Sequence, residues 1–324
     1  MAHGFVHRID PVIGTVAGVH LWWYGAGFAA GFLTLHRYVM RRRASLGLTR
    51  RDVWALSIVM ATATLAGGRL VQVLFDEWPF YSAHPGYLPV FWLGGMATHG
   101  LLGGSAIAAA VFAWRWRVPF LPLADALVVP GAILMGTGRL GNFIDGQIVG
   151  RVTDVWWAVQ FPYADGFRHP VVLYDGVKNL LLAAYLWRVR TGPHVPGAVA
   201  ARFVFWYAAP RILIDLLRDY PTYRLALGTG QTLNLAMAAL GAALLVRSRL
   251  RRLGRLPART AAPIRQAVDD QAPWPAQRLA FAALLAACLT MPSNWTQDVP
   301  RRYGDRHPGL SHSVLYPPIE WTPP

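Results

Sequence analysis

The sequence predicts an all-α polytopic membrane protein, because of its composition, its apolar runs and the placement of its arginines. Of the 324 residues, 54% are hydrophobic and only 15% are charged, which leaves too little polar surface to cover a soluble protein of this size. The net charge of +15 comes largely from arginines that stand between apolar runs. That distribution is typical of membrane topology and argues against a nucleic-acid partner.

Seven apolar stretches approach the ~20 residues that a helix needs to cross a bilayer. They cover residues 18–38, 53–75, 96–114, 120–138, 171–187, 198–217 and 229–246. The loops after the first, third, fifth and seventh stretches carry the arginine clusters. The positive-inside rule therefore places these loops in the cytoplasm and the N-terminus outside.

The C-terminal quarter divides the chain further. Residues 1–250 form the predicted seven-helix membrane domain, and residues 251–277 form a cytoplasmic linker rich in Pro, Ala and Gln. The segment 278–324 begins with Arg278, about 13 apolar residues and the chain's only cysteine, Cys288, followed by a polar tail that we expect outside. This short apolar run is either a possible eighth hydrophobic helix with an incidental cysteine or a segment that resembles a secretion signal.

Several ionisable or polar side chains lie inside the apolar stretches, where each charge costs ~2.5–3.5 kcal/mol to insert. They are Tyr24, Arg69, His99, Asp125, Arg139, Arg211 and Asp215. We expect three of them, Arg69, Arg139 and Arg211, to converge without matching carboxylates into a cationic pocket at the outer leaflet. Arginine suits a phospholipid headgroup because its planar fork holds phosphate oxygens and keeps its charge. Taken singly, each arginine could instead reach the interface or pair locally, and His99 could be a hydrogen-bonded core residue.

Ordered motifs across residues 10–250 resemble those of the prolipoprotein diacylglyceryl transferase family. They are "WYG" at 23–25, "GGR" at 67–69, "GGM" with "HG" at 94–100, "GTGRLGNFIDGQIVGR" at 136–151, "RHPVVLY" at 168–174, "RILIDLLR" at 211–218 and "GQTLNL" at 230–235. The resemblance implies a bacterial inner-membrane enzyme that transfers a diacylglyceryl group from phosphatidylglycerol to a lipobox cysteine in a prolipoprotein signal peptide, releasing glycerol phosphate. It implies neither a cofactor nor a metal.

The resemblance also assigns roles to residues. Arg139 and Arg211 match the family's phosphate-facing arginines, His99 matches a histidine that assists the thiol, and Tyr24 and Asn142 match pocket residues. We accordingly expect His99, Arg139, Arg211 and Tyr24 to be catalytic. The expected phosphatidylglycerol-binding residues are Arg69, Arg139, Asn142, Asp145, Gln147, Gly150 and Arg211.

The sequence departs from the family pattern at Asp145 and Gln147, where the family usually has Asn and Glu. Leu93 replaces an acidic residue, and Leu101 replaces a glycine. These departures leave open a non-catalytic or altered-specificity relative that binds anionic lipid or signal peptides. A third hypothesis is a small anion transporter, but the absence of a sequence repeat argues against it.

The resemblance to this family suggests an interpretation of the C-terminal segment. Its run Leu285–Cys288 has the form of a lipobox, so the chain could be a transferase fused to a substrate-like lipoprotein. Cys288 is then a predicted lipidation site, and lipoprotein signal peptidase would be a further partner.

Overall fold

Helices make up most of the molecule. The computed structural model describes residues 4–219, 229–256, 270–293 and 298–320. Within these ranges the seven predicted stretches correspond to seven helices of 19 to 25 residues: α1 (Trp23–Arg42), α2 (Arg50–Val71), α4 (Thr98–Trp116), α5 (Phe120–Ile144), α6 (Val171–Val189), α7 (Ala198–Leu216) and α8 (Thr229–Arg252). The structure is therefore that of an all-α protein.

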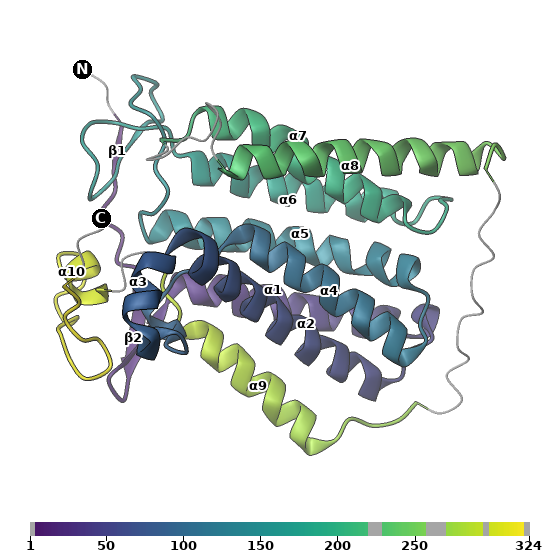
Figure 1. Cartoon of the computed structure of the whole chain (residues 1–324), viewed down its shortest axis with the longest axis horizontal. Helices are drawn as coiled ribbons and strands as arrows, with labels where there is room; N and C mark the ends of the chain where they lie inside the picture. Colours follow the sequence, from purple (N-terminus) through teal and green to yellow (C-terminus); the bar gives the residue numbers. More distant parts are fainter. Residues whose placement is uncertain (1–3, 220–228, 257–269, 294–297, 321–324) are drawn as a thin grey trace.

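Three of the helical segments described are long and apolar enough to cross a membrane by length and composition: Arg50–Asp76, Phe120–Ile144 and Gly230–Arg252. The helix ends that carry arginine runs lie at one end of the bundle, and the first and last described elements, β1 and α10, lie at the other (Figure 1). This separation of charge along the bundle is typical of a protein that sits in a membrane.

The first predicted stretch, 18–38, was placed too early in the chain. Its opening residues form β3 (Val19–Trp22), which pairs antiparallel with β2 (Val12–Val16). Ala17 and Gly18 connect the two strands with φ values of 50° and 80°, as a two-residue hairpin turn requires. The helix therefore begins only at Trp23.

Shorter elements gather at the terminal end of the bundle. They are β1 (Phe5–Val6), which pairs parallel with β4 (Val159–Gln160), and the helices α3 (Trp78–Ala83) and α10 (Val299–Tyr303). Two 3-10 turns, at 85–87 and 91–93, also lie here, whereas a third, at 44–46, joins α1 to α2 at the opposite end. A π-helical turn, Gln72–Asp76, follows α2 directly.

The long helices pack in a continuous series. Helix α2 packs on α4, α1 on α5, α5 on α6, α6 on α7, and α7 on α8, while α1 also contacts α2. The central helices share one apolar core, in which Val39, Leu56, Phe112, Leu123 and Leu186 are fully or almost fully buried. Close packing of such side chains gains the van der Waals contacts that hold helices together in a membrane.

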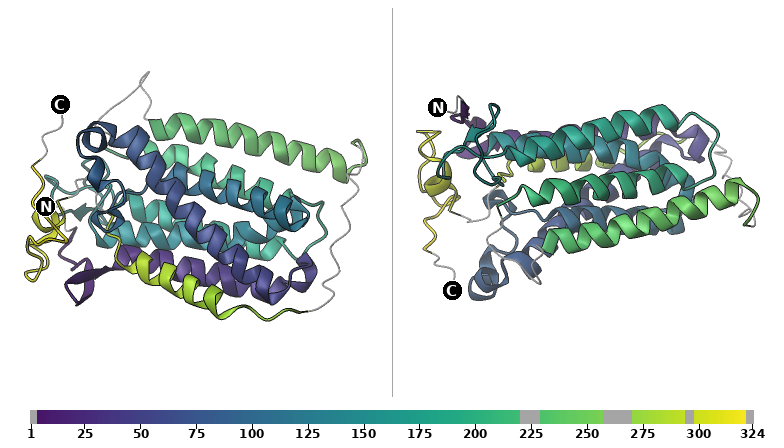
Figure 2. Two further views of the ribbon diagram at one scale, coloured as in Figure 1. Left: turned by 60° about the horizontal axis from the view of Figure 1, so that its bottom comes forward. Right: turned by 90° about the horizontal axis from the view of Figure 1, so that it is seen from above.

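One further helix, α9 (Pro275–Leu289), lies on the face opposite α7 and α8 (Figures 1 and 2). It packs against α1 and α2. Near its start, Gln277 donates to the carbonyl of Arg51 at 3.3 Å, and its last turn lies against Gly25 at the other end of α1. The central part of the predicted linker, residues 257–269, lies outside the described ranges.

Candidate active site

A cavity of about 560 Å³ lies between the helices near the terminal end of the bundle. This volume falls in the range of about 300–1,000 Å³ that small-molecule pockets occupy. Its wall includes Tyr24 from α1, His99 from α4, Arg139 and Asn142 from α5, and Arg211 from α7. The structure thus brings together five of the residues that the sequence singled out.

The rest of the wall is amphipathic. Its described charged side chains are three arginines, Arg139, Arg211 and Arg218, and one carboxylate, Asp76. Apolar side chains supply much of the remainder: Phe28, Val71, Phe75, Leu101, Leu134 and Leu233. A cationic wall beside an apolar one suits a ligand with an anionic headgroup and a hydrocarbon body.

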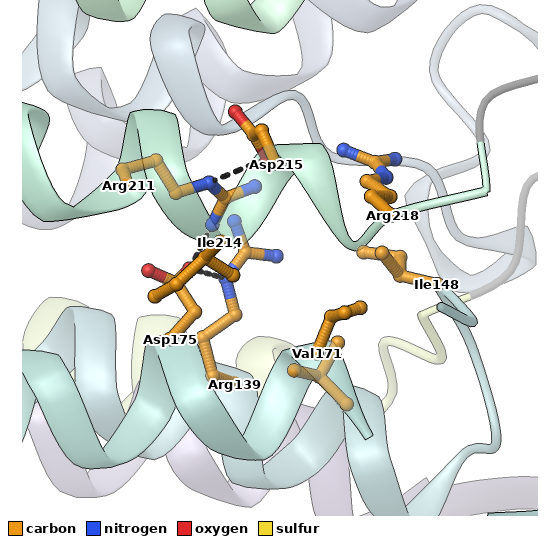
Figure 3. Close-up of a pocket in the computed structure, with 9 residues that line it drawn as sticks. Arg139, Ile148, Val171, Asp175, Arg211, Ile214, Asp215 and Arg218 are labelled. Carbon is orange, nitrogen blue, oxygen red and sulfur yellow. Dashed lines mark hydrogen bonds and ion pairs between the residues drawn. The ribbon is translucent and has the colours of Figure 1, made fainter. Parts of the chain in front are cut away.

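The two central arginines are tied together by one carboxylate. Asp175 of α6 is 1% exposed, and its Oδ2 accepts from Nε of Arg139 at 2.6 Å and from Nη1 of Arg211 (Figure 3). Its Oδ1 pairs with Nζ of Lys178, one turn along α6, at 2.9 Å. Three cations from three helices therefore converge on Asp175.

The remaining donors of the two arginines are also oriented. Arg139 donates through Nη1 to Oδ1 of Asn142 at 3.1 Å and through Nη2 to Oγ1 of Thr98 at 2.9 Å. Nε of Arg211 donates to Asp215, one turn along α7, at 3.0 Å, and Asp215 in turn accepts from Asn234 of α8 at 3.0 Å. The guanidinium planes are thus fixed before any ligand arrives, which lowers the reorganisation that binding requires.

The expectation that the arginines lack matching carboxylates is wrong. Asp175 and Asp215 lie directly behind Arg139 and Arg211. The sequence held a signal for the first of these, since "YDGVKN" places an acid and a base three residues apart inside an apolar run, where they share one helix face. Burial of charged groups requires such pairing.

Arg69 does not belong to this cluster. It is not among the residues of the cavity wall. Its guanidinium donates to the backbone carbonyls of Gly94, of Tyr87 at 3.2 Å and of Val90 at 3.3 Å, and lies 4.9 Å from the ring centroid of Tyr81. Arg69 therefore holds the 87–94 loop, which leads into His99.

His99 lies on the cavity wall at the first turn of α4. Its Nε2 is buried and makes no hydrogen bond to any residue within the described part of the chain. Close helix approach sets its position, because a Cβ on the neighbouring Gly100 would lie 2.1 Å from the carbonyl oxygen of Gly67. Both glycines thus let α2 and α4 cross closely.

Three predicted lipid-binding residues lie behind the wall and are not part of it. Oδ2 of Asp145 accepts from the backbone N–H of Ser293 at 2.7 Å, and burial raises the pKa of Asp145 to about 7. With its amide turned so that the oxygen faces Arg302, Gln147 accepts from Nε and Nη2 of Arg302 at 3.1 and 3.2 Å. Gly150 packs against His169, and its N–H donates to the His169 carbonyl at 3.1 Å.

Cys288 lies in the last turn of α9 and is fully buried. It belongs to the apolar cluster that contains Tyr24 and Phe28 of α1, which also line the cavity. Within the described ranges, no group of three or more His, Cys, Asp or Glu side chains could hold a metal ion.

The sequence model of the family described as prolipoprotein diacylglyceryl transferase matches residues 11–247. The chain belongs to this family. It is 35% identical to the phosphatidylglycerol–prolipoprotein diacylglyceryl transferase of Bordetella parapertussis over 247 residues, which are 73% of this chain and 94% of that protein. The enzymes of the same name from Nitrosomonas europaea and Geobacter sulfurreducens are also 35% identical, over 74% and 76% of this chain and 89% and 98% of their own lengths.

All but one of the described residues that line the cavity lie within the matched region, residues 11–247. Ser293 also lines the cavity, and it lies well beyond residue 247. Neither Ser293 nor Thr98 carried a signal in the sequence, since an isolated hydroxyl residue has no distinctive spacing.

Proposed function

We propose that this chain transfers the diacylglyceryl group of phosphatidylglycerol to the cysteine thiol of prolipoproteins, the first step of lipoprotein maturation. The names of its relatives, phosphatidylglycerol–prolipoprotein diacylglyceryl transferases, support this activity. The observation that links this activity to particular residues is the amphipathic cavity, in which Arg139, Arg211 and His99 share one wall.

In this reaction a C–S bond forms between the thiol sulfur and the terminal glycerol carbon of the diacylglyceryl group. The C–O bond from that carbon to phosphate breaks, and glycerol phosphate leaves with the electron pair. Arg139 and Arg211 stabilise the negative charge that grows on the phosphate, because their guanidinium groups are already oriented by Asp175. The acyl chains follow the apolar part of the wall toward the lipid.

The thiol must lose its proton to become an effective nucleophile. We assign this proton to His99, because the residue lines the shared cavity and its Nε2 has no hydrogen-bond partner among the described residues. Asn142 lines the same cavity and binds the headgroup, and Tyr24, also on this wall, is a further catalytic residue.

The proposed location is the bacterial inner membrane, with all seven long helices as spans. The three segments that meet the length and apolarity of a span support this. The arginine-rich helix ends face the cytoplasm in this arrangement, and the opposite end of the bundle, which carries β1 and α10 (Figure 1), faces outward.

The activity is tested with purified protein, phosphatidylglycerol vesicles and a lipobox peptide, by following glycerol phosphate release. We expect release from the wild type and at least a hundredfold less from Arg139→Ala, about the cost of removing one stabilising cation from a transition state. Binding of lipid or peptide without release would instead support the non-catalytic relative. Transport of anions into sealed vesicles without release would support the transporter.

The proposal extends to Cys288 as a lipidation site, with lipoprotein signal peptidase acting next. Because its thiol is fully buried against α1, the modification has to take place before α9 docks. Mass spectrometry of the C-terminal peptide from a host that makes lipoproteins tests this. A diacylglyceryl mass on Cys288 supports it, and an intact chain with a free thiol contradicts it.

A further inference from the structure

Part of the chain outside the family match contributes to the cavity. The C-terminal extension, residues 270–320, follows the matched region 11–247. One of its described residues, Ser293, lies on the cavity wall beside Asn142 and Arg139, and it is only 4% exposed. The extension is therefore more than a peripheral tail.

Helix α9 fixes the chain that leads to Ser293. Phe281 and Cys288, seven residues apart on one helix face, are its two buried residues. Its backbone touches α1 so closely that a Cβ on Gly25 would lie 2.0 Å from the Cys288 carbonyl oxygen. Met291, three residues further on, is 1% exposed. The path from α9 into the cavity is thus rigidly packed.

The described segment 298–320 is fixed as firmly. Tyr303 and Tyr316 are buried in a cluster with Trp22, and the Tyr316 hydroxyl accepts from the backbone N–H of His20 at 3.0 Å. Arg306 donates to the carbonyl of Asp145, within the family motif at 136–151, at 2.7 Å. Ser293 therefore lies between two anchored segments of the extension.

Ser293 itself makes two contacts with the family motif at 136–151. Its backbone N–H donates to Asp145, and its Oγ accepts from Nδ2 of Asn142. The amide of Asn142 is thereby oriented with Oδ1 toward Nη1 of Arg139. Since a hydroxyl that accepts one hydrogen bond still carries its own hydrogen, Ser293 can also donate into the cavity.

We infer that the C-terminal extension is part of the headgroup site, with Ser293 positioning Asn142 and donating a hydrogen bond to the phosphate or glycerol of the bound lipid. This inference rests on the proposed function. It also gives a reason for the two departures from the family pattern, since the side chains of Asp145 and Gln147 both contact the extension. These residues hold the extension in place.

The test compares Ser293→Ala, Ser293→Thr and a matched control, Ser311→Ala, an exposed serine of the same extension. We expect Ser293→Ala to lower kcat/KM for phosphatidylglycerol about tenfold, roughly the contribution of one hydrogen bond to a charged group. KM for the peptide and the Tm should stay unchanged. Ser293→Thr keeps the hydroxyl and should recover most of the loss, and Ser311→Ala should match the wild type.

Two results overturn the inference. One is a Ser293→Ala enzyme with wild-type kcat/KM for the lipid. The other is a loss that follows a lowered Tm and that Ser293→Thr does not repair, because such a loss reports packing alone.

Lipid binding provides a readout that does not depend on catalysis. Native mass spectrometry of the full-length protein with phosphatidylglycerol should rank wild type and Ser293→Thr above Ser293→Ala. If the three proteins bind the lipid in this order but the wild type releases no glycerol phosphate, the proposed transferase activity fails while the role of Ser293 stands. Equal binding of phosphatidylglycerol by the wild type, Ser293→Thr and Ser293→Ala overturns the role of Ser293, whether or not the protein has transferase activity.

Discussion

Two neighbouring regions of the cavity are held by different forces. On the α5–α7 side, one buried carboxylate, Asp175, joins Arg139, Arg211 and Lys178. On the other side, the C-terminal extension is held by aromatic packing and by single hydrogen bonds to Asn142 and Asp145. The first region is matched by the family model, and the second lies beyond it.

The two regions are expected to respond differently to substitution, because charge pairing stabilises the first and side-chain packing stabilises the second. An ion cluster loses its balance when one member is removed, because the remaining charges stay buried without compensation. A packed cap loses energy in proportion to the contacts that a substitution removes. Substitutions in the two regions should therefore differ in size and in what they disturb.

The largest effect is expected at Asp175. Asp175→Asn leaves Arg139, Arg211 and Lys178 without their common anion, at a cost of about 3–5 kcal/mol for breaking a buried pair. We expect a lower Tm and a fall in kcat/KM of at least a hundredfold. Asp125→Asn is the control, because Asp125 is a buried carboxylate of the same bundle that accepts from the N–H groups of Gly197 and Ala200, both at 2.7 Å, instead of holding the cavity's arginines. Equal effects on KM in both variants would contradict a special role for Asp175.

Next in size is displacement of α9 from α1. Gly25→Leu cannot be accommodated beside the Cys288 carbonyl, so α9 must move away. In protein synthesised without phosphatidylglycerol, where Cys288 keeps its thiol, a maleimide probe reports the movement directly, because Cys288 is the only cysteine of the chain and is buried. We expect slow labelling of the wild type and at least tenfold faster labelling of Gly25→Leu, with reduced transfer. Gly103→Leu, on α4 with no neighbour within 4 Å, should label like the wild type.

A smaller effect, dependent on pH, is expected at Asp145. Burial raises the pKa of Asp145 to about 7 from an ordinary value near 4, so the protonated form favours the fold. Stability from this group is full below the ordinary pKa and is lost as the pH rises toward 7. Asp145→Asn is neutral throughout and can still accept from Ser293, so its Tm should exceed that of the wild type at pH 8 and match it near pH 4. Exposed Asp154→Asn should leave the pH profile unchanged.

The smallest effect is expected at Gln147. Gln147→Glu restores the residue usual in the family and places a carboxylate against Arg302. The charge-assisted hydrogen bond offsets the cost of burying the new charge. We expect kcat/KM within about twofold of the wild type and a slightly higher Tm. A large gain in kcat/KM would show that a carboxylate here takes part in the reaction and does more than hold the extension.

The sequence predicted the helices better than the site. Long apolar runs and flanking arginines are local properties, so six of the seven predicted stretches begin within a few residues of a helix. The exception, 18–38, opens on a hairpin strand, because Val19–Trp22 is as apolar as a helix start would be. Among the site residues, Tyr24, His99, Arg139, Asn142 and Arg211 meet at one cavity.

The sequence by itself determined the membrane class, the helix positions and the family, because periodicity, apolar length and ordered motifs need no knowledge of packing. Only the tertiary structure decided which charges share a carboxylate and which arginine stands apart. Arg69 and Arg139 look alike along the chain, yet the first binds loop carbonyls and the second binds Asp175. Tertiary packing also brings Ser293 beside Asn142, 151 residues earlier in the chain. Such pairings depend on how helices pack in three dimensions, which no local pattern encodes.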